Sequence, residues 1–361
     1  MKNIAVIGSG KIGSVVANLL AENERYHVIV VDKEFKKNTR EEIGDKSGID
    51  FVELDINDEV SLEKFVTQYL PEALVSCLPY HLNKNVALCA RRFNLHYFDL
   101  TEDVAVTNSV RKIAEGAESA FVPQCGVAPG FINIAGHTLA QEFDEIDTIK
   151  MRVGALPLAP NNILKYSLTW SSDGLINQYG NACPAIRNGN FEMLQPLEGL
   201  ESVSIEGEIY ECFNTSGGIG TMANSYKGKA KNVFYKTIRY PGHCNIMRLL
   251  INDFKLNEKR HILKEILENA VPSTKHDFVL IYVTVNGSKN GDFFEESYIK
   301  RIYNQKVNKK HYTGIQLITA GSLCAVLDIV LNSDKKYKGF VCQEEFTLNQ
   351  VFNGRFGYLF N

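Results

Sequence analysis

The sequence lacks the features that mark several classes of protein. None of its eight cysteines stands in a CxxC pair, so they are expected to be free thiols and not parts of a disulfide framework or a zinc site. No run of about 18 apolar residues is present, which argues against a membrane span. The formal net charge is only -3, so no basic surface of the kind that neutralises nucleic-acid phosphates is expected.

The sequence also begins without the pattern of a secretory signal. "MKNIAVIG" enters an apolar strand at once, with no charged region, longer apolar region and cleavage site in succession. We therefore expect a cytoplasmic protein whose partner is a small molecule, not a membrane or a nucleic acid. With 361 residues, of which 45% are hydrophobic, the chain can build two domains with separate cores.

A glycine-rich stretch, "GSGKIG", lies between a predicted strand and a predicted helix. "NIAVIG" has the apolar run of a buried parallel strand, and "KIGSVVANLLAE" has apolar residues at helical spacing. In a dinucleotide-binding turn, Gly8 would make the tight turn, Gly10 would let the pyrophosphate approach, and Gly13 would pack the helix closely. Lys11 and Ile12 complete this predicted site. Incidental glycines are the alternative, which the flanking strand and helix disfavour.

The next apolar strand, "HVIVVD", ends in Asp32. A carboxylate there accepts hydrogen bonds from both ribose hydroxyls and repels a 2′-phosphate, so NAD is the predicted cofactor. Lys33, Lys36 and Lys37 follow directly and would suit a 2′-phosphate, which keeps NADP as the alternative.

Strand and helix patterns then alternate as far as "AFVPQCG" at residues 120–126, which predicts a parallel, doubly wound α/β sheet of the Rossmann type. Ligands of such sheets bind beyond the carboxyl ends of the strands. By this rule Asp55 and Ile56 would border the adenine, and Cys77, Leu78 and Pro79 the nicotinamide ribose.

From about residue 134 the pattern changes to β-branched and aromatic runs ended by Gly, Pro or Asn, such as "TIKMRVGALP", "YSLTWS" and "DFVLIYVTVNG". These runs predict a mixed, largely antiparallel sheet in an α+β domain for substrate binding and oligomerisation. The tail "TGIQLITAGSLCAVLDIVLN" has the pattern of a buried helix that returns to the first domain. The predicted boundaries are 1–126, 127–315 and 316–361, and we expect a homodimer or homotetramer.

Several segments together resemble the saccharopine dehydrogenase-like family. The first is "CGVAPGFINI" at residues 125–134. "IRNGN" (186–190), "FNTSGG" (213–218) and "YKTIRYPGH" (235–243) are most similar to the lysine 6-dehydrogenase branch. The resemblance covers about the first 255 residues, more than one domain. It implies NAD-dependent oxidative deamination of the lysine ε-amine to the semialdehyde.

The chain departs from the family pattern at two places. Ala128 stands where the glutamate-forming saccharopine reductases carry an acid before "PG", which favours the lysine branch, and "TED" replaces a Gly-Gly-His-like stretch after "HYFDL". Two alternatives therefore stay open. One is a saccharopine or carboxynorspermidine dehydrogenase acting on a secondary amine, and the other is a non-catalytic NAD(H) sensor.

An amino-acid substrate needs a partner for its α-carboxylate. Arg239 is the candidate, because a planar guanidinium can bind a carboxylate with two hydrogen bonds, although a surface strand arginine is the alternative. Thr215 and Ser216 would add hydroxyl or backbone donors, and Lys165 and Glu102 would shape the substrate end of the pocket.

Amine oxidation also needs a base that takes a proton from the ammonium and activates water against the imine. The predicted catalytic residues are Tyr80, Cys125 and His243, each of which has a structural role as its alternative. Further candidates for the base are His81, Asp99 and Glu102. No metal-ligand spacing is present, so no metal is expected.

Overall fold

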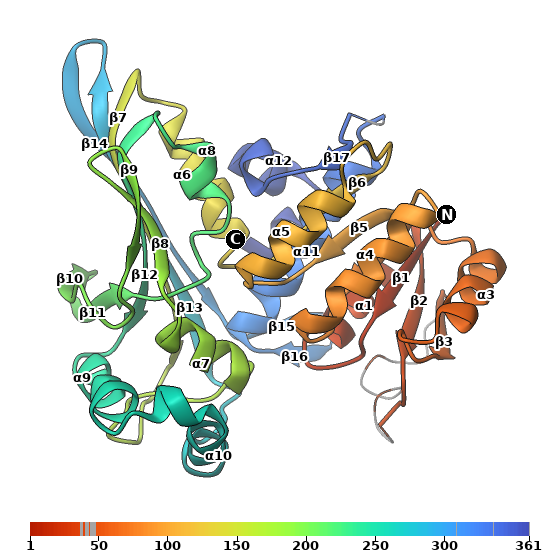
Figure 1. The fold of residues 1–361 in the computed structure, drawn as a ribbon, viewed down its shortest axis with the longest axis horizontal. Coiled ribbons are helices and arrows are strands. Elements are labelled where there is room, and N and C mark those ends of the chain that lie inside the picture. Colours follow the sequence, from red (N-terminus) through yellow and green to blue (C-terminus); the bar gives the residue numbers. More distant parts are fainter. Residues whose placement is uncertain (37–38, 40–42, 44–47, 308, 335, 361) are drawn as a thin grey trace. The chain divides into compact units, whose positions relative to one another are not determined.

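The computed structural model describes residues 1–36, 39, 43, 48–307, 309–334 and 336–360. These residues form two compact units (Figure 1). Unit 1 consists of Met1–Gly130 and Gln316–Asn361, and unit 2 consists of Phe131–Ile315. Unit 1 is therefore built from both ends of the chain, and unit 2 is inserted between them.

Unit 1 contains a seven-stranded, wholly parallel sheet in the order β17-β6-β5-β4-β1-β2-β3. The order steps outward from β1 in both directions, which confirms the predicted Rossmann architecture. The strands are β1 (Lys2–Ile7), β2 (Tyr26–Asp32), β3 (Ile49–Glu53), β4 (Ala73–Ser76), β5 (His96–Asp99), β6 (Ala120–Val122) and β17 (Gly339–Phe340).

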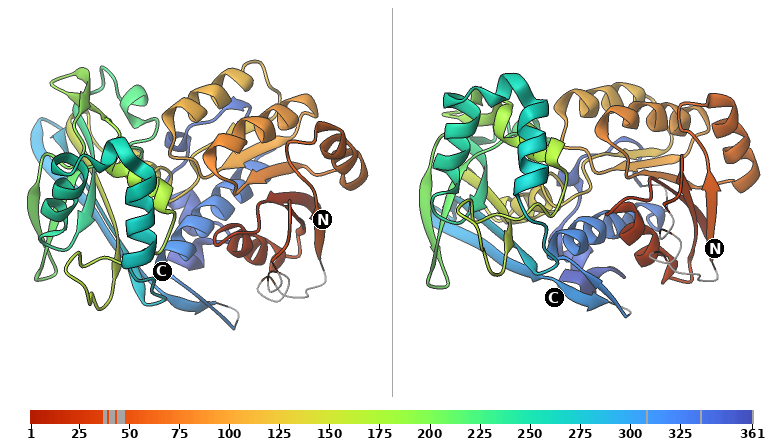
Figure 2. Two further views of the ribbon diagram at one scale, coloured as in Figure 1. Left: turned by 60° about the horizontal axis from the view of Figure 1, so that its bottom comes forward. Right: turned by 90° about the horizontal axis from the view of Figure 1, so that it is seen from below.

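Helices cover both faces of this sheet (Figure 2). On one face lie α3 (Glu59–Tyr69), α4 (Asn83–Arg92) and α5 (Val104–Ile113), whose apolar residues share one core cluster with the sheet. On the other face lie α1 (Gly13–Ala21) and α11 (Gly314–Leu331). The short segments are η1 (Tyr80–Leu82), η4 (Gln343–Glu345), α12 (Leu348–Asn353) and η5 (Gly357–Phe360).

The helix α11 is long and apolar enough to cross a membrane by length and composition, but 83% of it is buried inside the protein. It begins at the end of unit 2, and all but its first two residues belong to unit 1. The predicted return of the chain to the first domain is thus confirmed.

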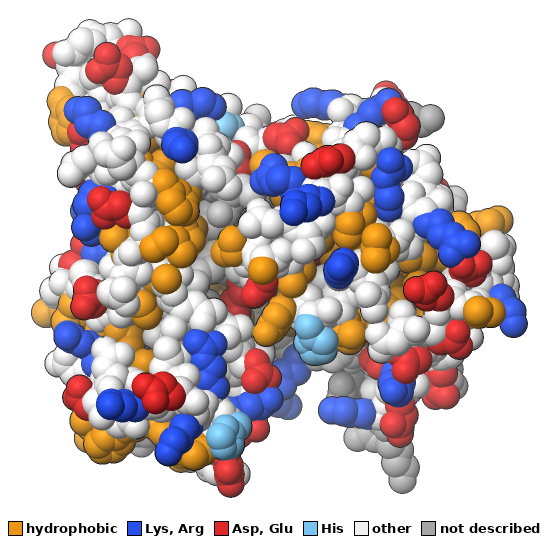
Figure 3. All heavy atoms as spheres, in the orientation of Figure 1, with side chains coloured by type: hydrophobic (Ala, Val, Ile, Leu, Met, Phe, Trp, Pro, Cys, Tyr) orange, Lys and Arg blue, Asp and Glu red, His pale blue; other side chains and the backbone are white. Residues whose placement is uncertain are grey.

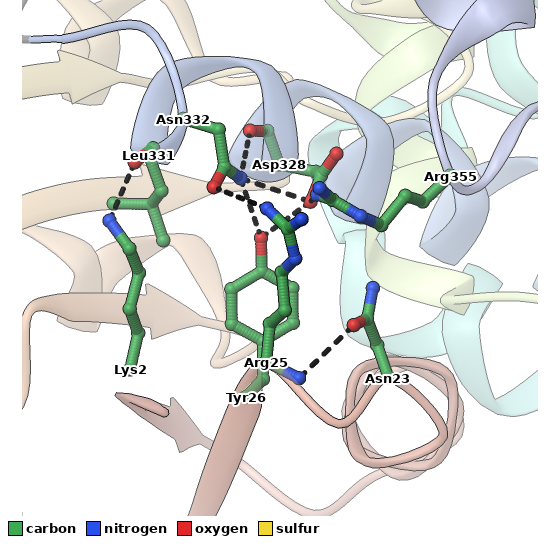
Figure 4. Close-up of polar contacts among 8 residues, drawn as sticks. All are labelled: Lys2, Asn23, Arg25, Tyr26, Asp328, Leu331, Asn332 and Arg355. Carbon is green, nitrogen blue, oxygen red and sulfur yellow. Dashed lines mark hydrogen bonds and ion pairs between the residues drawn. The ribbon is translucent and has the colours of Figure 1, made fainter.

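A polar cluster fastens the end of α11 to the first two strands (Figure 4). The Tyr26 hydroxyl donates to Asp328 Oδ1 over 2.6 Å, and Arg355 pairs with the same carboxylate. Asn332 donates from Nδ2 to the Tyr26 hydroxyl and to Asp328. Lys2 adds a bond of 2.6 Å to the carbonyl of Leu331.

Unit 2 contains an eight-stranded mixed sheet in which β12 and β7 run parallel and the other pairs are antiparallel. Its path is β10-β11-β12-β7-β13-β14, and the β8-β9 hairpin branches from β12. The strands are β7 (Glu145–Pro157), β8 (Cys183–Arg187), β9 (Asn190–Leu194), β10 (Glu201–Ile205), β11 (Glu208–Asn214), β12 (Ala230–Arg239), β13 (Asp277–Lys289) and β14 (Asp292–Tyr303); β15 (Gln305–Val307) and β16 (Lys310–Tyr312) pair separately.

This sheet curls so that its two end strands come together. Arg301 on β14 donates to the carbonyl of Ile205 on β10 and forms an ion pair with Glu206. The curl encloses an apolar cluster that includes Leu156, Ile238 and Leu280. Burial of these side chains on the concave face stabilises the curled form.

Helices pack on the other face of the unit 2 sheet. Phe131–Ala140 form α6, which contacts β7 and β13, and Ser172–Gly180 form α7, which shares a core cluster with Phe213 of β11. The others are α8 (Met222–Ser225), α9 (His243–Arg248), η2 (Leu249–Asp253), η3 (Leu256–Lys259) and α10 (Arg260–Ala270).

The prediction of a strand at residues 166–171 ("YSLTWS") in unit 2 is wrong. The segment is irregular and is held by side chains and by single backbone bonds. The Leu168 amide bonds to the carbonyl of Pro272, and Ser171 caps the next helix by accepting from Gly174.

Candidate functional site

The glycine-rich turn between β1 and α1 has the geometry of a nucleotide cradle. Gly8 has φ +101°, a conformation that favours glycine, and a Cβ on Gly13 would lie 1.8 Å from the carbonyl oxygen of Gly8. At Gly10 an added Cβ would meet nothing within 4 Å. Gly8 and Gly13 are therefore required by the turn itself, whereas the space at Gly10 is open for a ligand.

The start of α1 carries no group that would repel an anion. The N-cap residue Ile12 provides no side-chain hydrogen bond, and no acidic residue stands in the first turn. Lys11 is exposed, and its carbonyl accepts a bond from Gln316. The amides of Ser14 and Val15 already bond to the carbonyls of Gly10 and Ile12, so the support for a pyrophosphate here is the helix dipole together with the open space at Gly10.

Asp32 ends β2 beside the same turn. Its Oδ2 accepts from both the amide and the hydroxyl of Ser9, each over 2.6 Å, and its Oδ1 accepts from the amide of Lys33. The carboxylate is thus fixed at the position where a ribose is expected. Lys33 forms an ion pair of 3.0 Å with Asp55, so its charge is partly compensated. Lys36 is exposed, and Lys37 lies outside the described residues.

The other predicted cofactor residues differ in their accessibility. Asp55 is half-buried, and the pKa of its carboxyl is lowered by the amide of Asn57 and by Lys33. Ile56 is 5% exposed, and its side chain packs in the sheet core. Cys77 and Leu78 are half-buried after β4, and Pro79 is exposed.

Tyr80 begins the short helix η1 after β4 and is 39% exposed. Its ring contacts that of His81, which is also exposed. Glu102 follows β5 in a half-buried position. These three residues belong to unit 1 and come after strands whose carboxyl ends lie at one edge of the sheet.

Cys125 has a structural environment, contrary to the prediction that it is catalytic. It is fully buried, and its Sγ lies 3.1 Å from the carbonyl of Val122. Burial and the nearby carboxylate of Asp99 raise the pKa of the thiol far above its usual range, so it stays protonated. Asp99 is itself enclosed, since it accepts from the Tyr97 hydroxyl and from the amides of Thr101 and Gln124.

Arg239, at the end of β12, is a buried cation in unit 2. It is 2% exposed, yet no acidic group of the described residues forms an ion pair with it. Its Nε donates to the Tyr179 hydroxyl over 2.9 Å, and its Nη1 donates to the carbonyl of Ile238 over 2.8 Å. Its guanidinium carbon lies 5.0 Å from the ring centroid of Tyr166. A buried guanidinium without a counter-charge favours an anionic ligand.

His243 follows Arg239 in the chain and is 1% exposed. Its Nδ1 lies 2.9 Å from the carbonyl oxygen of Leu164, and its Nε2 lies 2.9 Å from the Tyr179 hydroxyl. Burial and the charge of Arg239 lower the pKa of His243 to about 3. Both ring nitrogens are engaged and the lowered pKa makes the ring a weak base, which argues against the predicted role as general base.

The "NTSGG" segment follows β11 on the same face of the sheet. Thr215 is 2% exposed, and its hydroxyl has no partner among the residues that the structure describes. The Ser216 hydroxyl donates to the carbonyl of Ala182, so its expected bond to substrate is already used. A Cβ on Gly218 would lie 2.1 Å from the ring of Tyr235, which makes glycine necessary there. Thr215 therefore remains available for a ligand.

The predicted pocket residue Lys165 is exposed and donates to the carbonyl of Pro241, in the turn before His243. Tyr179 was not among the site residues predicted from the sequence. Its hydroxyl joins Arg239 to His243. Only the spacing of α7, which places Tyr179 on the sheet-facing side of the helix, could have indicated this role.

The outer surface carries charges of both signs. On the face drawn in Figure 3, Lys and Arg side chains are interspersed with Asp and Glu, with hydrophobic groups between them. That face therefore shows no continuous basic band of the kind that follows a nucleic-acid backbone.

Comparison with known families gives two matches that together span most of the chain. The saccharopine dehydrogenase NADP binding domain matches residues 4–122, and the saccharopine dehydrogenase C-terminal domain matches residues 126–356. The boundary between the two matches falls close to the end of the first part of unit 1.

Two curated relatives are saccharopine dehydrogenases [NADP(+), L-glutamate-forming]. The one from Schizosaccharomyces pombe is 24% identical over 276 residues, which cover 72% of this chain and 59% of the relative. The one from Saccharomyces cerevisiae is 21% identical over 265 residues, which cover 70% and 58%. The chain thus spans less than two thirds of the length of the curated relatives that it matches.

A solved structure supports the same fold. Apo saccharopine dehydrogenase (L-Glu forming) from Saccharomyces cerevisiae has a TM-score of 0.80 at 16% identity, covering 97% of this chain and 95% of that chain. The family match over both parts of the sequence and the fold agree, and they confirm the predicted resemblance. The chain belongs to the saccharopine dehydrogenase family of pyridine-nucleotide oxidoreductases.

Proposed function

We propose that this protein is a pyridine-nucleotide-dependent dehydrogenase that oxidises a CH–NH bond of an amino-acid substrate, with Arg239 binding a substrate carboxylate. The observation that carries the proposal is the burial of Arg239 without an acidic partner among the described residues. A buried guanidinium is costly unless it is paired, and a carboxylate is its best geometrical match.

The reaction is a hydride transfer followed by hydrolysis. The carbon that bears the nitrogen gives its hydride to the nicotinamide, and the nitrogen loses a proton to become an imine. Water then adds to the imine and releases an amine and an aldehyde. The bound nucleotide supplies the hydride acceptor. Unit 1 would hold its pyrophosphate at the glycine-rich turn before α1 and its ribose at Asp32.

The base of this reaction is proposed to be Tyr80. Among the predicted catalytic residues it alone is accessible, since Cys125 is a buried protonated thiol and His243 is a buried neutral ring. Its position after β4, at the carboxyl edge of the sheet, is where the nicotinamide end of a dinucleotide is expected. Proton transfer by a positioned side chain typically contributes about 10²–10⁴-fold to the rate.

The substrate is proposed to carry a secondary amine, as in saccharopine, because the curated relatives are named for saccharopine. Oxidative deamination of the lysine ε-amine is the second candidate. The observation that favours it is Ala128, half-buried before Pro129 at the position where the glutamate-forming enzymes were expected to carry an acid. A missing carboxylate there would remove a partner for the larger amine.

NAD is the proposed cofactor, although the curated relatives are named for NADP. The support is Asp32, whose carboxylate is fixed by Ser9 and Lys33 and would face a 2′-phosphate with like charge. Lys33, the nearest described cation in the sequence, is already paired with Asp55.

A homodimer or homotetramer formed through unit 2 is also proposed. The edge strand β14 carries the exposed side chains Phe293, Phe294, Ile299 and Tyr303. Long exposed edge strands with apolar side chains are unusual on monomers. Light scattering during size-exclusion chromatography measures the assembly directly, and a monomeric mass would contradict this part of the proposal.

The function is tested by following nicotinamide reduction with purified protein, NAD or NADP, and saccharopine, L-lysine or diamines that have no carboxylate. We expect turnover of an amino acid and not of the diamines, because the diamines cannot pair with Arg239. Arg239→Ala should lose this turnover, whereas Arg152→Lys is the control and should keep it, since Arg152 is a buried arginine that already pairs with Glu201. Tight NADH binding without turnover of any amine would contradict the proposal and favour an NAD(H) sensor.

A further inference from the structure

The side chains around Arg239 form a hydrogen-bonded chain with a defined direction. It runs from Arg239 Nε through the Tyr179 hydroxyl to the ring of His243 and ends at the carbonyl of Leu164. We infer that Tyr179 and His243 are positioning residues, which fix the Arg239 guanidinium so that one edge of it faces the substrate carboxylate. This inference rests on the proposed carboxylate-binding role of Arg239.

The direction of these hydrogen bonds follows from the groups at the two ends of the series. A backbone carbonyl only accepts, so His243 Nδ1 carries the proton that is donated to Leu164. In a neutral ring Nε2 then only accepts, so the Tyr179 hydroxyl must donate to it. The oxygen of Tyr179 is left as the acceptor for Arg239 Nε, which only donates. Each member has a single role, and the reverse direction is excluded by the two end groups.

The surroundings keep this arrangement in place. His243 packs edge-on against the rings of Tyr166 and Tyr179, and it stacks on Phe213 with an interplanar angle of 16°. Glu211 on β11 lies opposite Arg239 on β12 in the strand register, but the two side chains form no ion pair. Glu211 instead accepts from the amides of Gly242 and Cys244 at the start of α9, so it does not compete for the guanidinium.

The arrangement determines which donors remain for a ligand. Nε is taken by Tyr179, and one proton of Nη1 is taken by the carbonyl of Ile238. Nη2 donates to no described residue. The carboxylate would therefore bind end-on, through Nη2 and the second proton of Nη1, and not side-on through Nε. Without Tyr179, Nε would be a competing donor and the guanidinium would be free to turn.

Binding of glutarate, a dicarboxylate that cannot be oxidised, tests the inference without turnover. Calorimetry should show that Tyr179→Phe raises the Kd of glutarate about tenfold, the loss expected for a hydrogen bond to a charged group. The Kd of NADH should not change. His243→Gln should raise the Kd of glutarate less, because a glutamine can still accept from Tyr179. The double variant should lose less binding free energy than the sum of the losses in the two single variants. Tyr26→Phe removes a buried tyrosine hydroxyl in unit 1 and is the matched control, with no change expected.

A second measurement reports the direction of the hydrogen bonds themselves. Nitrogen NMR of labelled histidine should show His243 with a protonated Nδ1 and an unprotonated Nε2 from pH 8 to pH 5, and Tyr179→Phe should shift the Nε2 signal. A protonated Nε2 in the neutral ring, wild-type glutarate affinity in Tyr179→Phe, or no glutarate binding by the wild type would each overturn the inference. Failure of the proposed function appears separately, as absence of nicotinamide reduction with every amine tested.

Discussion

Asp32 is the residue proposed to set the cofactor preference, through one fixed negative charge. Replacing it by serine removes the repulsion of a 2′-phosphate, so the ratio of kcat/KM for NADP to that for NAD should rise at least about tenfold. Asp50→Ser, at an exposed acid on the neighbouring strand, is the control and should leave the ratio unchanged. An unchanged ratio in Asp32→Ser would show that another group selects the nucleotide.

Cys125 is expected to be dispensable for the chemistry. Its thiol is buried and its pKa is raised, so a thiolate is not available at neutral pH. Cys125→Ala should keep kcat/KM within about twofold of the wild type, and iodoacetamide should not label Cys125 in the native protein. If Cys125→Ala lost turnover but had the melting temperature of the wild type, Cys125 would have to take part in catalysis.

The sequence could predict the cofactor residues better than the substrate residues, for a physical reason. Gly8, Gly13 and Asp32 follow from a local strand-turn-helix pattern, and the geometry at each agrees with the predicted role. The roles of Cys125 and His243 depend on burial and on partners far away in the chain, which no local pattern contains.

The turn after β11 depends on close packing of a glycine against a ring. Gly218→Ala would place a methyl group 2.1 Å from Tyr235, so the variant should lose about 1–3 kcal/mol of stability through overpacking. Thermal unfolding measures this loss, and adding Tyr235→Leu should recover part of it. If Gly218→Ala melted like the wild type, the segment would be able to move without cost, contrary to its hydrogen bonds to Gln178 and Ala182.

The end of α11 is fastened to β2 by the cluster of Tyr26, Asp328 and Arg355 (Figure 4). Asp328→Ala leaves the buried Tyr26 hydroxyl without its acceptor, which should cost about 1–3 kcal/mol. Hydrogen exchange should report faster exchange of α11 amides, whereas those of β13 in unit 2 should keep their rates. Unchanged exchange in α11 would mean that apolar packing alone holds the helix.

The elements themselves were largely predictable. The alternating patterns up to residue 126 predicted strands and helices whose types agree with the structure, because each buried face has a regular period. The segment "YSLTWS" has the composition of a strand but no neighbouring strand to pair with, and tertiary contacts hold it in an irregular form. The curling of the unit 2 sheet around Arg301 also has no local signal.

At the scale of the whole molecule, the buried histidine links stability to pH. His243 has an ordinary pKa of 6.5 when unfolded and about 3 when folded, so between these values only the unfolded chain takes up the proton. Unfolding is then favoured, and stability falls as the pH decreases from about 6.5 towards 3. His243→Gln should flatten this dependence in denaturant titrations. Burial raises the pKa of Asp99 and Asp277, and these two groups therefore favour the folded state as the pH falls. The contribution of His243 must accordingly be measured as the difference between His243→Gln and the wild type.

The division into a nucleotide unit and an inserted mixed-sheet unit explains why the two parts of the function can be tested apart. Unit 1 contains the glycine turn and Asp32, and unit 2 contains Arg239 with its hydrogen-bonded chain. Variants of Arg239 should therefore leave the Kd of NADH unchanged while they weaken carboxylate binding.

The central claim is that Arg239 recognises a substrate carboxylate, and the most direct measurement compares an amino-acid substrate with its amide. The kcat/KM of wild type and Arg239→Ala would be measured for both compounds. We predict that Arg239→Ala lowers kcat/KM for the acid at least about a hundredfold, as expected for a lost charged pair, and leaves the slow turnover of the amide unchanged. Equal losses for acid and amide would contradict the account, because Arg239 would then support the fold and not the carboxylate.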